Sequence, residues 1–194
     1  MYDFNMLVSY PWSQYAKAKK EIQNIMKRLG EEKPFVTRTI AEGILGVKTC
    51  QKPREVIHAL QRMLNEDPTI FQYTSKWVPI ELWTYSDIDS LKKAADQLKT
   101  EIHVGEKWRI TLEKRRFTKY HKIEIIRSIA ELIDEKVDLK NPDKILYIEI
   151  IGKYAGIAIL RPDDLFSTAG VSSCFNYHRK KSSWRANSEK KERL

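Results

Sequence analysis

The sequence has 194 residues, 42% of them hydrophobic, which is enough for one or two small domains with packed interiors. Its formal net charge of +9 favours a polyanionic partner such as a nucleic acid. Cys50 and Cys174 are far apart and have no C-x-x-C partner, which argues against a disulfide framework and a zinc site and fits a reducing cytoplasm. No apolar run reaches the length of a membrane span, and no basic segment opens the chain as in a secretion signal. We therefore expect a cytoplasmic protein without a membrane partner.

The first 76 residues alternate between strand and helix signals. Apolar residues at helical spacing mark two helices, the first ended by Gly30 and the second begun by Pro53. β-rich runs on either side of Gly43 predict a hairpin, because glycine supplies the turn conformation. The expected order is strand, helix, strand, strand, helix and strand, over residues 4–9, 15–29, 35–40, 44–49, 53–67 and 70–76.

This βαββαβ order predicts an α+β domain of the ferredoxin-like type over residues 1–79, with a four-stranded sheet and two helices on one face. The stretch that follows, residues 76–81, contains Pro79, which fixes its own φ and favours extended geometry at Val78. We expect this stretch to be a stiff linker to a second domain. A plain strand end before a helix is the alternative.

Residues 80–170 have the pattern of an α/β domain. Ser86-Asp-Ile-Asp89 resembles a capping box, and the apolar stripe after it predicts a helix. The order that follows is basic strand, helix, strand and strand, over residues 107–116, 121–136, 145–151 and 157–160. The last two runs are almost purely apolar, which is typical of central strands covered on both faces.

Positive charge is concentrated in the basic strand and the residues after it. Residues 86–178 are nearly neutral, with 16 basic and 15 acidic side chains, yet residues 107–122 contain seven Lys or Arg and one acid. Such sorting suits a surface that binds phosphates. Charges that keep an exposed strand edge from aggregating are the alternative. The expected phosphate contacts are Lys107, Arg109, Lys114, Arg115, Arg116, Lys119 and Lys122.

No catalytic or metal site can be recognised in the sequence. It has no phosphate-binding loop, no dinucleotide-binding glycines, no H-E-x-x-H and no cysteine cluster. The four histidines are isolated, without the i, i+4 partner of a helical metal site, and a turn explains Asp163-Asp164. We therefore expect no catalytic residues, no cofactor, no metal and no enzyme activity.

The last residues, 171–194, are expected to form a basic, disordered tail. Residues 179–194 carry seven basic and two acidic side chains without apolar periodicity. Such a tail either adds phosphate contacts or only improves solubility, and both interpretations stay open.

Four segments of the second half follow one another in order: Lys107-Trp-Arg-Ile-Thr-Leu-Glu-Lys-Arg-Arg116, Val137-Asp-Leu-Lys-Asn-Pro-Asp143, Ile145-Leu-Tyr-Ile-Glu-Ile-Ile151 and Gly156-Ile-Ala-Ile-Leu160. This series resembles a THUMP domain, a module that binds RNA and delivers tRNA to modification chemistry. THUMP proteins commonly carry a ferredoxin-like domain just before the THUMP core, in agreement with the pattern of residues 1–79.

Since no catalytic module is recognised, the chain resembles the stand-alone THUMP adaptors that help an RNA acetyltransferase make N4-acetylcytidine in tRNA. The resemblance implies that the chain binds tRNA and presents it to a separate acetyltransferase. Trp77, Tyr120 and Trp184 are candidates to stack on unpaired bases. The alternatives are an RNA-modifying enzyme or subunit with an unrecognised active site, and a ribosome-associated interaction protein. Replacing Arg115 and Arg116 by Ala should weaken tRNA binding without changing the melting temperature.

Overall fold

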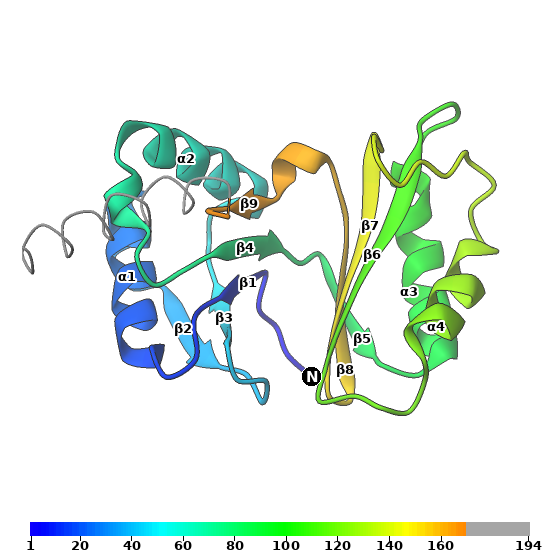
Figure 1. Ribbon diagram of the computed structural model, residues 1–194, viewed down its shortest axis with the longest axis horizontal. Coiled ribbons are helices and arrows are strands. Elements are labelled where there is room, and N and C mark those ends of the chain that lie inside the picture. The colour runs from blue at the N-terminus through cyan, green and yellow to red at the C-terminus, as the bar shows by residue number, and fades with distance from the viewer. Residues whose placement is uncertain (170–194) are drawn as a thin grey trace, which may run out of the picture.

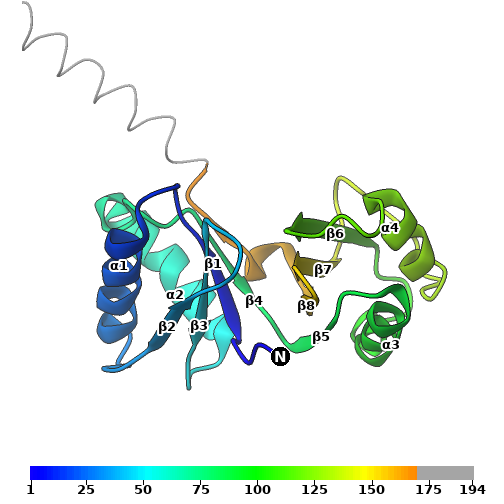
Figure 2. The same cartoon turned by 90° about the horizontal axis from the view of Figure 1, so that it is seen from below.

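The computed structural model describes residues 1–169, which form a mixed α/β fold with two sheets (Figure 1). The predicted basic tail, residues 171–194, lies outside the described residues, and Trp184 with it. Figure 2 shows the two sheets facing each other, each with its helices on the outer side.

The first sheet is antiparallel, with the strand order β2-β3-β1-β4-β9. Its strands are β1 (Met6–Ser9), β2 (Phe35–Arg38), β3 (Ile44–Lys48), β4 (Lys76–Pro79) and β9 (Phe166–Ser167). Helices α1 (Tyr15–Arg28) and α2 (Pro53–Glu66) cover one face. Because side chains alternate along a strand, β1 packs Met6 and Val8 against these helices and Leu7 against the second sheet.

The first half has the expected order of elements, but its last strand begins at Lys76, so the prediction of a strand over residues 70–76 is wrong in its bounds. Pro68–Ile70 forms a 3-10 turn, in which the Asp67 carboxylate accepts a main-chain N–H at 3.0 Å. The next three N–H groups, of residues 72–74, each donate to the carboxylate of Glu21 at 2.8 Å. They are therefore not available to a neighbouring strand, and pairing begins only at β4.

Two further differences concern how the halves are joined. Residues 76–81 were expected as a linker, but they contain β4, so Pro79 ends a strand that is paired with β1. β9, which the sequence did not indicate, returns from the second half and pairs with β4. The chain therefore connects the two halves twice, and the first sheet has one strand more than the βαββαβ pattern supplies.

The second sheet has the order β5-β8-β7-β6. Its strands are β5 (Leu82–Tyr85), β6 (Trp108–Arg115), β7 (Lys144–Ile151) and β8 (Tyr154–Leu160). β6 and β7 are parallel, and their connection contains α4 (Lys122–Ala130), because parallel neighbours need a long crossover. α3 (Ile88–Leu98) lies beside α4 on the same face of the sheet (Figure 2). Trp108 and Leu112 of β6 are buried in the core under these helices.

The helix after β6 is shorter than predicted. It ends at Ala130, whereas the sequence pattern extended over residues 121–136. The N–H groups of Leu132 and Ile133 donate to carbonyls only three residues before them, so the helix tightens and stops, although Ile133 stays buried.

The start of α3 is also one residue away from the predicted capping box. The Asp87 carboxylate accepts the N–H of Ser90 at 2.9 Å and caps the helix. Ser86 instead donates its hydroxyl to the carbonyl of Gly152, which ties the end of β5 to the β7–β8 turn.

Each sheet forms one core with its own helices, and a third core lies between the two sheets. β7 is buried on both faces, as its apolar sequence predicted: Leu146 and Ile148 face α3 and α4, while Ile145 and Ile151 face the first sheet. The residues of this intersheet core are Phe4, Leu7, Ala41, Ile44, Val78, Ile80, Ile145, Tyr147, Ile151, Ala158 and Leu160. The two sheets therefore bury one another.

A chain of polar contacts crosses this core. The Nζ atom of Lys76 on β4 donates to the Tyr147 hydroxyl at 2.9 Å, and that hydroxyl donates to Glu149 Oε2 at 2.7 Å. Arg115 Nε, on β6, donates to Glu149 Oε1 at 2.6 Å. Burial lowers the pKa of Lys76 and raises that of Tyr147. We refer to Lys76, Tyr147, Glu149 and Arg115 as the intersheet network.

None of the helices within residues 1–169 has both the length and the apolar character needed to cross a membrane. The location in the cytoplasm stays a prediction.

The intersheet network changes the expectation for Arg115. Glu149 is only 3% exposed, so replacing Arg115 by Ala leaves a buried carboxylate without its cationic donor. We expect the free energy of unfolding to fall by about 1–3 kcal/mol, as for other buried polar groups that lose a partner. Urea unfolding curves measure this loss. Arg116→Ala is the control and should change stability by less than about 0.5 kcal/mol, whereas equal losses for both variants would contradict the role of Arg115.

Close packing at Gly46 of β3 provides a second test of the intersheet core. A Cβ atom there would lie 2.3 Å from Cδ2 of Phe4, so the ring must move. We expect Gly46→Ala to lower the free energy of unfolding by about 1–3 kcal/mol, the usual cost of overpacking. The loss should be smaller in a Phe4→Leu background, since a smaller side chain relieves the overlap. An identical loss in both backgrounds would show that Phe4 does not fill this space.

Candidate nucleic-acid interface

The seven cations expected to bind phosphate divide between the two ends of β6. Lys107 and Arg109 stand at its start, while Lys114, Arg115 and Arg116 stand at its end. Lys119 and Lys122 follow that end, in the loop and at the first residue of α4. A strand rises about 3.3 Å per residue, so these ends lie roughly 20 Å apart. The structure therefore does not bring the seven side chains into one cluster.

The two cations at the start of β6 are engaged by the turn before β7. Lys107 Nζ lies 3.6 Å from Asp138 Oδ2, and Arg109 Nη1 donates to the carbonyl of Leu139 at 2.9 Å. Asp138 also accepts the N–H groups of Asn141 and Lys140, and these hydrogen bonds lower its pKa. This end of the strand therefore has a structural role in shaping the turn.

Two of the cations at the other end are engaged as well. Lys114 Nζ donates to the carbonyl of Tyr120 and lies 5.7 Å from the centre of the Phe117 ring, so it holds the β6–α4 loop. Arg115 belongs to the intersheet network. Both side chains are therefore bound by groups within the protein and stabilise this end of β6.

Arg116, Lys119 and Lys122 remain as exposed side chains around the β6–α4 loop. Within residues 1–169, none of the three has a carboxylate within 4.0 Å. Arg116 has a φ of 55°, a left-handed conformation that ends β6 and turns the chain outward. A hydrogen bond with the Tyr120 side chain raises the pKa of Lys119. We call these three residues the β6-end surface.

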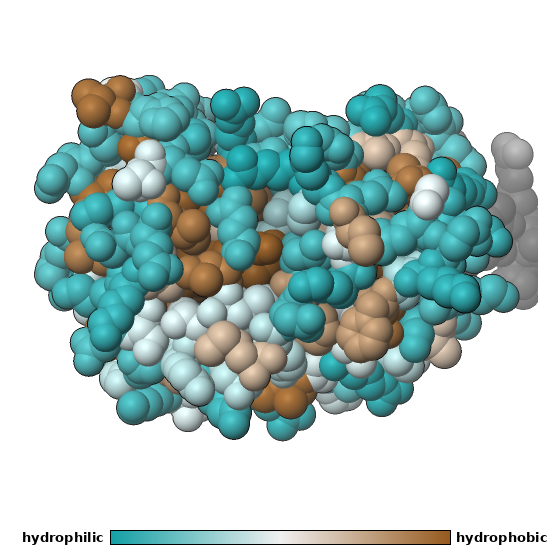
Figure 3. All heavy atoms as spheres, turned by 180° about the vertical axis from the view of Figure 1, so that it is seen from behind, coloured by the Kyte–Doolittle hydropathy of each residue, from teal (hydrophilic) through white to brown (hydrophobic). Residues whose placement is uncertain are grey.

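The sequence did not indicate that aromatic side chains lie at the same end of the sheet. Tyr2, Phe4, Trp83, Tyr85 and Tyr154 form a chain of ring contacts with centroids 5.0–6.3 Å apart. Tyr85 is 52% exposed. We call this group the aromatic seam, because it includes residues of both halves. Figure 3, seen from behind, shows apolar and weakly polar side chains gathered between the halves on that face.

The β7–β8 turn connects the aromatic seam to the β6-end surface. The N–H of Gly152 donates to the carbonyl of Arg115 at 2.9 Å, which places the turn beside the end of β6. Lys153 follows in this turn, exposed, with Nζ 5.2 Å from the centre of the Tyr154 ring. Cations beside exposed rings can bind phosphates and stack unpaired bases. The pairing of β5 with β8 creates this arrangement, and the sequence pattern contained no sign of β5.

Of the candidates for base stacking predicted from the sequence, the structure excludes Trp77 and leaves Tyr120 available. Trp77 is fully buried, with its indole N–H donating to Thr74 Oγ1 at 3.1 Å, so the proposal that it stacks on a base is wrong. Tyr120 lies in the β6–α4 loop, with Lys119 Nζ 5.0 Å from its ring centre, and stays a candidate. In the part of the chain that the structure describes, no three His, Cys, Asp or Glu side chains are grouped as metal ligands would be.

Solved structures share this two-sheet fold at low sequence identity. PH1313 from Pyrococcus horikoshii Ot3 matches with a TM-score of 0.58 and 22% identity, over 80% of this chain and 54% of that chain. TrmN from Thermus thermophilus matches with a TM-score of 0.57 and 13% identity, over 81% and 46%. A 4-thiouridine synthetase in complex with RNA and ATP matches with a TM-score of 0.51 and 15% identity, over 82% and 42%. No curated protein sequence is similar enough to be matched.

These matches contradict the expectation that the chain is not an enzyme. The synthetase is an enzyme, and two further matched chains are described as a DNA methylase and a methyltransferase. The chain spans about half the length of the solved structures it matches.

The family comparison concerns the second sheet. The model described as the THUMP domain matches residues 85–160, a range that runs from the last residue of β5 to the end of β8 and contains β6 and both of its neighbouring helices. This is also the region in which the four sequence segments resembled that domain. Residues 85–160 of this chain form a THUMP domain.

Proposed function

We propose that the chain binds tRNA as the substrate-binding part of an RNA-modifying enzyme. The THUMP domain at residues 85–160 carries this proposal. Support also comes from the 4-thiouridine synthetase, which shares the fold and was solved with RNA bound. An acetyltransferase partner has no support from the comparisons.

The contacts we propose use a subset of the seven cations. Arg116, Lys119 and Lys122 bind backbone phosphates, because they are exposed and form no ion pair among the described residues, although Asp87 acts on Lys119 from a longer distance. Tyr85 of the aromatic seam stacks on an unpaired base; its ring contacts that of Tyr154, beside which Lys153 lies. Lys114 and Arg115 hold the end of β6 that carries this surface. Lys107 and Arg109 hold the turn before β7 at the other end of the strand.

The domain organisation belongs to the same proposal. Residues 1–79 would be a ferredoxin-like domain and residues 80–170 the THUMP-containing domain. β9 then belongs to the second domain by sequence but pairs with β4 in the sheet of the first. The intersheet core then gives the RNA a single rigid body to bind.

Binding of labelled tRNA at several salt concentrations tests the phosphate contacts. Replacing Arg116, Lys119 and Lys122 together by Ala should lower the affinity at least several-fold. The slope of log K against log salt should become shallower by about 2.1–2.7, since each of the three lost phosphate contacts removes about 0.7–0.9. Lys93→Ala, at an exposed lysine of α3, is the control and should change the slope by less than one contact. If the triple variant and the control bind alike, this surface is not the interface.

The class of reaction can be tested separately. The protein is purified from its own cells with the proteins bound to it and incubated with tRNA and a labelled methyl, sulfur or acetyl donor. We expect label from one donor to enter the tRNA, because the chain presents the substrate. Acetyl label on cytidine would support N4-acetylcytidine formation. Absence of label from all three donors, with tRNA binding intact, would contradict a role in these modifications and leave a ribosome-associated role to be tested with rRNA.

A further inference from the structure

Helix α1 carries a second concentration of positive charge, far from β6. Five of its fourteen residues are Lys or Arg, and its single acid, Glu21, is buried. Figure 1 shows α1 and α4 at opposite ends of the molecule.

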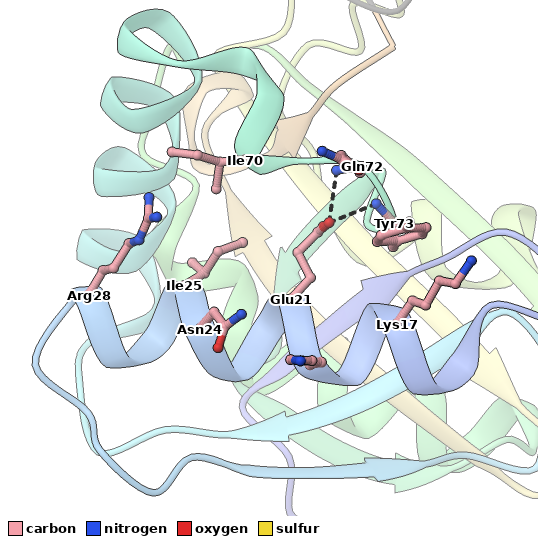
Figure 4. Close-up of a pocket in the computed structure, with 9 residues that line it drawn as sticks. Lys17, Glu21, Asn24, Ile25, Arg28, Ile70, Gln72 and Tyr73 are labelled. Atoms are coloured by element: carbon pink, nitrogen blue, oxygen red, sulfur yellow. Dashed lines mark hydrogen bonds between the residues drawn. The ribbon is translucent and has the colours of Figure 1, made fainter.

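A cavity of about 270 Å³ opens beside this helix, between α1 and the loop that follows the 3-10 turn. Figure 4 shows Lys17 and Arg28 at its two ends, with Asn24 between them and Tyr73 opposite. We call it the α1 pocket. Its lining residues are Lys17, Lys20, Glu21, Asn24, Ile25, Arg28, Ile70, Gln72 and Tyr73.

The carboxylate that lines the pocket, that of Glu21, accepts hydrogen bonds from the protein itself. Glu21 accepts three main-chain N–H groups at 2.8 Å and the Thr74 hydroxyl at 2.7 Å, all from residues 72–74 (Figure 4). These four donors hold the loop against α1 and turn the carboxylate away from solvent. The exposed side of the pocket therefore presents cations and amides.

Among the described residues, the cations of the pocket form no ion pair, although Arg28 is near enough to Asp67 to help lower the pKa of that carboxylate. Within residues 1–169, no carboxylate lies within 4.0 Å of Lys17, Lys20 or Arg28. Lys17 Nζ lies 5.2 Å from the centre of the Tyr73 ring, so its charge stays near the mouth of the pocket. All three side chains are exposed, as is Asn24, which adds an amide donor. Three cations and an amide around one hollow suit a phosphate group.

We propose that the α1 pocket binds a backbone phosphate of the same RNA, which therefore extends across both halves of the protein. The inference rests on the proposed function. The pocket is smaller than the roughly 300–1,000 Å³ typical of enclosed small-molecule sites, which favours a group projecting from a larger molecule. A long polyanion can also reach both α1 and the β6-end surface, which a small anion cannot.

The test uses the full chain with labelled tRNA and the double variant Lys17→Gln/Lys20→Gln. Both lysines are exposed, so the variant should fold, and circular dichroism checks that it does. We expect a several-fold loss of affinity and a salt slope shallower by about 1.4–1.8, the value for two lost phosphate contacts. The matched control is Lys27→Gln on the same helix, because Lys27 does not line the pocket and lies 3.1 Å from Glu32. The control should bind as the wild type does.

Each other outcome overturns the inference in a recognisable way. If the double variant binds as the wild type does and the Arg116, Lys119 and Lys122 variant binds more weakly, the pocket does not bind the RNA. The proposed function then still holds. An equal loss in the Lys27→Gln control means that the net charge of α1 acts, and not the pocket. If the wild-type chain binds no tRNA, the proposed function and the pocket fail together.

Discussion

The burial of β7 on both faces is the constraint on which the rest of the structure depends. One face is covered by α3 and α4 and the other by the first sheet, so the two halves cannot separate without exposing an apolar strand. Glu149 and Tyr147 lie on this strand, and a buried carboxylate needs charged or hydrogen-bonding partners. Arg115 and Lys76 supply them from two different strands, which fixes β6 and β4 relative to β7.

This constraint separates two kinds of cation that look alike in the sequence. Lys114 and Arg115 shape the end of β6, and their contacts hold the loop from which Arg116, Lys119 and Lys122 project. The aromatic seam reaches the same end of the sheet because β5 pairs with β8 and the N-terminal segment crosses beneath them. A binding surface for RNA thus depends on the packing of the halves as much as on its own charges.

The sequence predicted what local pattern determines. The buried strand β7 could be predicted from its apolar run, and the order of the first elements from the spacing of their apolar residues. Pairing between distant residues could not be predicted from local sequence. The partner of Arg115, Glu149, is 34 residues away, and β9 pairs with a strand about 90 residues before it. The strand expected over residues 70–76 failed because Glu21, on a distant helix, captures the N–H groups that a sheet would have used.

Acetylation of lysines with and without bound tRNA, read by mass spectrometry, tests the central claim most directly. If the RNA lies on the end of the sheet where β6 and the β7–β8 turn meet, Lys119, Lys122 and Lys153 should become protected. Lys93 on α3 and Lys136 after α4 should keep their reactivity. Protection of Lys93 and Lys136, with Lys119 and Lys122 as reactive as in the free protein, would contradict the account.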